Sequence, residues 1–275
     1  MSVPRHHAAA KGTWYLMEYR LVMNLTYDGA DYFGWQRQTN QEPTIQGVLE
    51  EKIGQIMNKK VSVVASGRTD RGAHALSQWA HVDIPKDPVG ANLLHKLNRL
   101  TPDSLRINRL YVTTRAFHAQ QSVEKKEYFY KIQNATVPHP FKQKYHYHVR
   151  HRLDVNLLNK LATYLVGQQD FKSFQSTGTD VETTVRTIFA AYWLLSEDNF
   201  TFHIVGDGFL KQMVRNIVGT MIWCTPRPAP EQEFTNIIAS LDRRQAKMPA
   251  PAHALFLKSV HYPKSLSMLL KPINS

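Results

Sequence analysis

Apolar and polar residues begin to alternate along this chain near Tyr19. From there to the Asp-Gly pair at 28–29, apolar side chains occupy every second position, which predicts a half-buried strand that ends in a turn. Apolar residues then recur at helical spacing after Pro43 up to Met57, so we expect a helix with Thr44 as its N-cap. Further strands are predicted over 61–65, 77–84 and 106–113, and a further helix over 91–100.

The second half of the chain has a similar order of elements. A helix over 156–167 is expected to end at Gly167, and two strands over 186–196 and 199–206 are expected to form a hairpin. Two more helices are predicted over 209–223 and 233–243. This order favours an α+β fold of two halves, each an antiparallel sheet backed by helices, with a central cleft between them.

The boundary between these halves is expected within 138–153, a segment that is rich in proline, histidine and basic residues and lacks a clear period. We therefore expect an N-terminal half over 17–140 and a C-terminal half over 141–275. Residues 1–16 precede the first periodic pattern, and we expect them to be a flexible extension.

The charge of the chain indicates a polyanionic partner. Its 34 lysines and arginines exceed its 22 acidic residues, which gives a net charge of +12 that is spread along the chain. Such a surface suits nucleic acid, because bound cations release the counterions of phosphates. The single cysteine, Cys224, excludes an internal disulfide, and no apolar run is long enough to span a bilayer. We expect a cytoplasmic protein without a membrane anchor.

Candidate chemistry is concentrated in residues 66–75, SGRTDRGAHA, which follow an apolar strand. Asp70 lies there between Arg68 and Arg71, and flanking guanidiniums would lower the pKa of its carboxyl and keep it ionised. An ionised carboxylate suits a nucleophile. An Arg-Asp pair that only braces a turn would have the same composition, and the residues alone leave both interpretations open.

Part of this segment, GRTDRGAHA, closely resembles the catalytic signature of the tRNA pseudouridine synthase A family. Other segments resemble that family in the same order, from Tyr19 to Tyr262: YDGADYFGWQRQ with TIQGVLE, RAFHAQQSVEKKEYFYKIQN, DFKSFQ, FLKQMVRNIVGTM and APAHALFLKSVHY. The resemblance implies an isomerase that converts uridine to pseudouridine at positions 38–40 of the tRNA anticodon stem-loop. It also implies a homodimer and an RNA-binding role for the central cleft.

The resemblance extends to single residues. It implies that Asp70 is the catalytic carboxylate, that Arg68 supports it, and that Tyr128 packs against the target uracil. It also implies that Arg215 approaches Asp70 from the second half. The sequence departs from the family pattern at four places outside the GRTD core, which bear on RNA contacts more than on the reaction: Arg71, Ala73, Gln120 and His253-Ala254.

Two predicted elements support this interpretation by their side chains. In a strand through 125–132, Lys126, Tyr128 and Tyr130 would share one face, which suits a stacked base beside a phosphate. In the helix over 209–223, Lys211 and Arg215 would lie together at i and i+4, where an anion would relieve their repulsion. We expect Lys211 to bind tRNA and Tyr130 to belong to the core.

The chemistry itself requires no redox cofactor, because the isomerisation neither gains nor loses electrons. Asp70 could attack C1′ of the ribose, add to C6 of the base or remove a ribose proton, and the sequence does not separate these routes.

The densest histidine cluster, His146, His148 and His151, has no carboxylate or cysteine at a ligand spacing, so we expect no metal site. His74 is expected to orient the loop through a hydrogen bond. A zinc-dependent deaminase is excluded by the lone cysteine, whereas a non-catalytic RNA-binding protein would share the basic surface and the aromatic residues.

Overall fold

The computed structural model describes residues 19–39, 42–84, 92–178 and 181–273. Within these ranges one sheet of eleven strands runs through the molecule, in the order β11-β4-β1-β3-β10-β5-β9-β8-β7, with β2 paired to β3 and β6 to β5. The strands are β1 (Tyr19–Tyr27), β2 (Val63–Ala65), β3 (His74–Ile84), β4 (Leu105–Thr113), β5 (Lys125–Asn134), β6 (Tyr147–Val149), β7 (Gly167–Asp170), β8 (Val185–Ser196), β9 (Asn199–Gly206), β10 (Leu255–His261) and β11 (Lys271–Pro272). The predicted extension, residues 1–16, lies outside the described residues.

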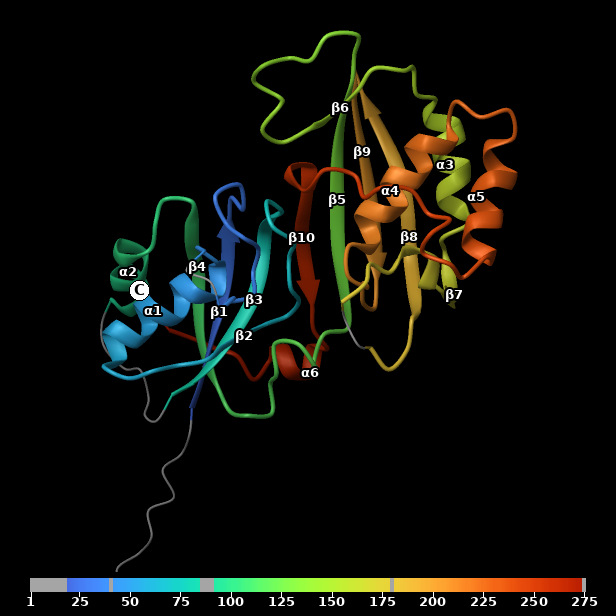
Figure 1. Cartoon of the computed structure of the whole chain (residues 1–275). Helices are drawn as coiled ribbons and strands as arrows, with labels where there is room; N and C mark the ends of the chain where they lie inside the picture. Colours follow the sequence, from blue (N-terminus) through green and yellow to red (C-terminus); the bar gives the residue numbers. More distant parts are fainter. Residues whose placement is uncertain (1–18, 40–41, 85–91, 179–180, 274–275) are drawn as a thin grey trace, which may run out of the picture.

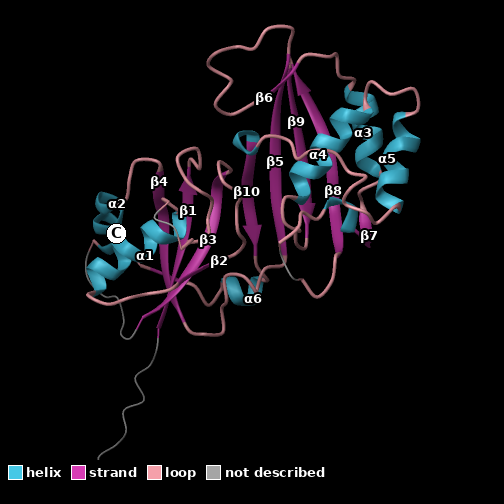
Figure 2. Cartoon of the chain, viewed as in Figure 1, coloured by secondary structure: helices cyan, strands magenta, loops and turns pink. Residues whose placement is uncertain are grey.

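Helices cover this sheet in two groups (Figures 1 and 2). α1 (Ile45–Met57) and α2 (Leu93–Leu100) pack beside β1, β3 and β4, whereas α3 (Val155–Thr163), α4 (Met213–Cys224) and α5 (Pro230–Ala239) pack beside β8 and β9. A short α6 (Lys264–Ser267) follows β10. The α+β class predicted from the sequence is confirmed. No helix in the described part of the chain is long and apolar enough to cross a membrane.

The predicted cap of α1 is confirmed. The Thr44 hydroxyl accepts a hydrogen bond from the Gly47 N–H at 3.2 Å, and the helix ends at Asn58 in the left-handed region. Leu49 and Ile53 of this helix are fully buried against the sheet. The helix therefore begins and ends where its local sequence directs.

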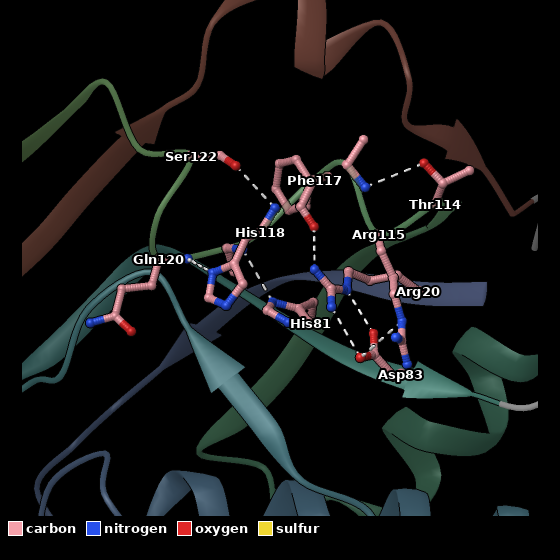
Figure 3. A network of polar contacts seen from close by, with 11 residues as sticks. Arg20, His81, Asp83, Thr114, Arg115, Phe117, His118, Gln120 and Ser122 are labelled. Atoms are coloured by element: carbon pink, nitrogen blue, oxygen red, sulfur yellow. Dashed lines mark hydrogen bonds and ion pairs between the residues drawn. The ribbon is translucent and has the colours of Figure 1, made fainter. Parts of the chain in front are cut away.

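The first strand differs from its prediction, because both of its faces are buried. Arg20 and Val22 are buried as well as the alternate apolar residues. The Arg20 guanidinium pairs with Asp83 through Nε at 2.7 Å and Nη2 at 3.0 Å, and its Nη1 donates to the Phe117 carbonyl at 2.5 Å (Figure 3). A distant segment thus covers the face that was expected to meet water, and the half-buried interpretation is wrong.

Two helix boundaries in the second half also differ from prediction. α3 ends at Thr163, and Gly167 begins β7 with a φ of +109°, so that glycine starts a strand and does not end the helix. α4 begins only at Met213, because Gln212 adopts a left-handed conformation with a φ of +59°. Lys211 therefore precedes the helix.

β10 connects strands that are distant in the sequence. This strand is parallel to β3, with Phe256 opposite His74, and antiparallel to β5, with Leu257 opposite Tyr128. In Figure 1 the red β10 lies between β3 and the green β5. A strand close to the C-terminus thus joins two strands from the first half of the chain. The division at 140/141 stays a prediction.

Candidate active site

The segment SGRTDRGAHA, residues 66–75, contains the connection between β2 and β3. The Gln78 side-chain amide holds this connection through two hydrogen bonds. Nε2 donates to the Gly67 carbonyl at 2.9 Å, and Oε1 accepts from the Ser66 hydroxyl at 2.5 Å. Gly72 turns the chain back with a φ of +78°, a conformation that glycine adopts at little cost. The connection therefore holds Asp70 close to the start of β3.

Asp70 forms an ion pair with Arg215 of α4, although 145 residues separate the two. Arg215 Nη1 donates to Asp70 Oδ2 at 2.7 Å, and the two side chains are 12% and 23% exposed, respectively. Arg215 Nε also donates to the Ala250 carbonyl at 2.7 Å. Among the described residues Asp70 Oδ1 has no hydrogen-bond partner. The geometry therefore leaves one carboxylate oxygen open to a substrate.

The two arginines close to Asp70 in the sequence, Arg68 and Arg71, are arranged differently from our expectation. The Arg71 guanidinium lies 3.7 Å from the centre of the Phe33 ring, a cation–π contact at the surface. Arg68 is exposed and makes no hydrogen bond or ion pair within the described ranges. Neither Arg68 nor Arg71 forms an ion pair with Asp70 in the described part of the chain; the charge partner is Arg215, which the resemblance implied. The supporting role of Arg68 stays a prediction.

The alternating face predicted for β5 is confirmed, and it forms one wall of the site. Tyr128 is 7% exposed and meets the Phe209 ring edge-on, with ring centres 5.1 Å apart. Burial, with a smaller contribution from the charge of Asp70, raises the pKa of Tyr128 well above its ordinary value, so its phenol stays neutral. Tyr130 is fully buried, as expected of a core residue, and its hydroxyl donates to the Pro251 carbonyl at 2.8 Å.

Lys211 does not lie beside Arg215. Its Nζ donates to the Thr177 carbonyl at 2.8 Å, in the turn that follows the short helix Lys172–Phe174. The predicted spacing of i and i+4 fails because the helix has not begun at Lys211. Binding of tRNA by this lysine stays a prediction.

His74 makes the kind of contact that was expected of it. Its Nδ1 accepts from the Gly29 N–H at 3.0 Å, and its Nε2 donates to the His253 carbonyl at 2.9 Å. Burial lowers the pKa of His74, although the Asp28 carboxylate, whose Oδ1 lies 2.9 Å from Nδ1, acts in the opposite direction. The histidine thus ties the start of β3 to the chain just before β10.

The other histidines contact separate groups. His146 and His148 bond to the carbonyls of Lys142 and Ala135, and His151 bonds to a threonine hydroxyl. In the ranges that the structure describes, no group of three His, Cys, Asp or Glu side chains is placed to hold a metal ion.

Sequence reasoning missed two parts of the site. One is the segment 248–251, whose carbonyls accept from Arg215 and Tyr130 and whose approach requires a glycine in α4. A Cβ at Gly219 would lie 2.1 Å from the Met248 carbonyl oxygen. The other is Gln78, which fixes the loop with Asp70 from β3. Two signals pointed to the first: the resemblance of APAHALFLKSVHY, which begins at Ala250, and the proline spacing in MPAPAH, which indicates an extended chain.

Comparisons with known proteins agree with the resemblance. A family model described as tRNA pseudouridine synthase matches residues 24–106 and 161–263. The tRNA pseudouridine synthase A of Bdellovibrio bacteriovorus is 39% identical over 91% of this chain and 97% of its own length. The enzyme of the same name from Chlamydia felis is 36% identical over 92% of this chain and 95% of its own length.

Among solved structures, a chain of the "Crystal Structure of a Cbf5-Nop10-Gar1 Complex" has a TM-score of 0.31 and 11% identity, over 71% of this chain and 43% of that one. A similarity at that level carries no argument. The family model and the relatives cover most of the chain, including the loop with Asp70 and the helix with Arg215. The chain therefore belongs to the tRNA pseudouridine synthase family.

Proposed function

We propose that Asp70 is the catalytic carboxylate of this isomerase and that the substrate is a uridine at positions 38–40 of the tRNA anticodon stem-loop. The observation that carries the proposal is the Asp70–Arg215 pair, with one carboxylate oxygen bonded and the other open. In the reaction the glycosidic bond between N1 and C1′ breaks, the uracil turns, and C5 bonds to C1′. The proton on C5 is then released to solvent and N1, freed from C1′, takes up a proton, so that the product is an isomer of the substrate.

The residues around Asp70 suit the three routes that the sequence leaves open, because each of them needs an ionised carboxylate close to the ribose or the base of the target nucleotide. Arg215 binds Asp70 Oδ2 and fixes the orientation of the carboxylate. Tyr128 supplies an aromatic surface that replaces part of the stacking lost when the uridine leaves the stem. Arg68, exposed beside Asp70, would contact the displaced RNA.

The wider assignments belong to the same proposal. A tRNA substrate supports a cytoplasmic location. A homodimer is supported by the sheet face opposite α3 and α5, where Tyr192 and Leu194 of β8 are exposed at 38% and 54% while Trp193 between them is buried. Exposed apolar side chains in one strand face favour an interface.

Asp70→Asn tests the catalytic assignment. The amide keeps the shape of the side chain but removes the charge, so we expect pseudouridine formation to fall by at least about 10³-fold, with tRNA binding unchanged or tighter. Tritium release from 5-³H-uridine tRNA measures the reaction. A melting curve of the same preparation shows whether the variant is folded, and mass spectrometry excludes deamidation to Asp. Substantial tritium release from folded variant would assign Asp70 a role in bracing the turn only.

Two substitutions of Tyr128 separate its ring from its hydroxyl. Because the phenol stays neutral, we expect Tyr128→Phe to keep most of the activity, whereas Tyr128→Leu should lose about 10-fold or more with the stacking surface. Single-turnover rates at saturating tRNA measure the difference. Equal and deep losses in both variants would instead give the hydroxyl a part in proton transfer.

Binding of tRNA through phosphates predicts a steep dependence on salt. We expect the logarithm of the affinity to fall linearly with the logarithm of salt concentration, and Lys211→Ala to reduce the slope by about one. The matched control is Lys59→Ala, an exposed lysine after α1. An affinity that does not change with salt, or a Lys211→Ala slope equal to that of the wild type, would contradict the proposed contact.

The oligomeric state tests the homodimer. Sedimentation velocity should show a species of twice the chain mass, and Leu194→Glu should shift it toward the monomer, because the substitution puts charge into an apolar contact. A wild-type protein that sediments as a monomer at micromolar concentration would rule out a stable dimer.

A further inference from the structure

One lysine next to the candidate site is not used in the mechanism above. Lys126 lies in β5 two residues before Tyr128, and its side chain runs along the catalytic loop at Gly67. A Cβ at Gly67 would be 2.9 Å from Lys126 Nζ and 3.6 Å from Cε, so a larger residue there would displace the end of this lysine. Lys126 therefore packs directly against the residue that precedes Arg68.

The surroundings of Lys126 offer its charge no counter-ion. Within the described residues its ammonium makes no hydrogen bond or ion pair. Its cross-strand neighbours, Gly206 of β9 and Val260 of β10, carry no charge. Burial is the main reason that the pKa of Lys126 falls to about 8.

A second cation lies close to this lysine. The charge of Arg186, in β8, lowers the pKa of Lys126 further. Arg186 Nη1 donates to the carbonyls of Thr183 and Val185, and no carboxylate pairs with Arg186 in the part of the chain that the structure describes. Asp207, the acidic residue that follows β9, accepts from the Thr187 N–H. The two cations thus repel each other, and an anion bound near Lys126 would relieve the repulsion.

We propose that Lys126 binds a backbone phosphate of the tRNA next to the target nucleotide, with Arg186 as the second cation of this phosphate site. The inference rests on the proposed function, because that function places the uracil base against Tyr128. Two residues along a strand span roughly 7 Å, which allows the base to lie at Tyr128 and a neighbouring phosphate at Lys126. A lysine ammonium binds phosphate as a compact charge with three donors. The absence of a side chain at Gly67 lets this ammonium lie beside the loop with Asp70.

The titration of Lys126 makes the phosphate site measurable. A bound phosphate would raise the pKa of Lys126. At a pH above the pKa of the free protein, where Lys126 is neutral, tRNA binding therefore takes up a proton. With a free pKa of about 8, we expect the Kd of wild-type protein for an unmodified tRNA transcript to rise about tenfold from pH 7 to pH 9. Lys126→Arg should bind at pH 7 and lose most of this rise, because arginine stays charged throughout.

Removal of the charge separates binding from stability. We expect Lys126→Met to raise the Kd at pH 7 about tenfold or more. Its melting temperature should equal or exceed that of the wild type, because an uncompensated charge has been replaced by an apolar side chain. Lys125→Met is the matched control: it removes a neighbouring lysine from the other face of β5 and should change the Kd much less.

Three outcomes would overturn the phosphate site. They are a wild-type Kd for Lys126→Met, a lower melting temperature or loss of folding in that variant, and a pH profile of Lys126→Arg that still rises tenfold. The first and third would show that no phosphate depends on the lysine, and the second would show a structural role. Pseudouridine formation by the wild-type protein is measured in parallel. If the wild type forms none, the proposed function fails; if it forms pseudouridine and one of the three outcomes occurs, only the phosphate site fails.

Discussion

The ion pair between Asp70 and Arg215 is the contact on which the rest of this molecule depends. Each partner comes from a different part of the chain: the carboxylate stands on the turn between β2 and β3, and the guanidinium stands on α4. Neither side chain is fully exposed, so a loss of one partner would leave the other charge poorly solvated. The fold must therefore place a loop and a helix within hydrogen-bond distance before any chemistry is possible.

That placement depends on β10. The strand is synthesised near the end of the chain, yet it pairs with β3 and β5 from the first half. The segment just before it, 248–251, accepts hydrogen bonds from both Arg215 and Tyr130. Contacts of such long sequence separation form slowly, because the intervening chain must first be ordered. The site is accordingly among the parts of the fold that require nearly the whole chain.

Local patterns predicted most elements of the structure, and their failures have a common cause. Thr44, the hairpin of β8 and β9 and the alternating face of β5 depend on neighbours in sequence, and they are where the sequence places them. Lys211 was assigned to a helix because apolar residues at helical spacing extend back to 209. The left-handed Gln212 instead delays the start of α4 to Met213. The charge partner of Asp70 could not be identified from nearby arginines, because a contact across 145 residues leaves no periodic signal. Only the family resemblance indicated Arg215.

The attachment of Arg215 has a consequence for the energetics of substrate binding. Its side chain donates to the Ala250 carbonyl, and its own carbonyl accepts from the Ala250 N–H at 3.0 Å. Backbone and side chain are thus both tied to one residue, and the guanidinium has few rotamers left before RNA arrives. An arginine that is free in solution loses considerable conformational entropy when a ligand orders it. Here that entropy is lost during folding, so less of the binding energy of the RNA is consumed in ordering the Asp70–Arg215 pair.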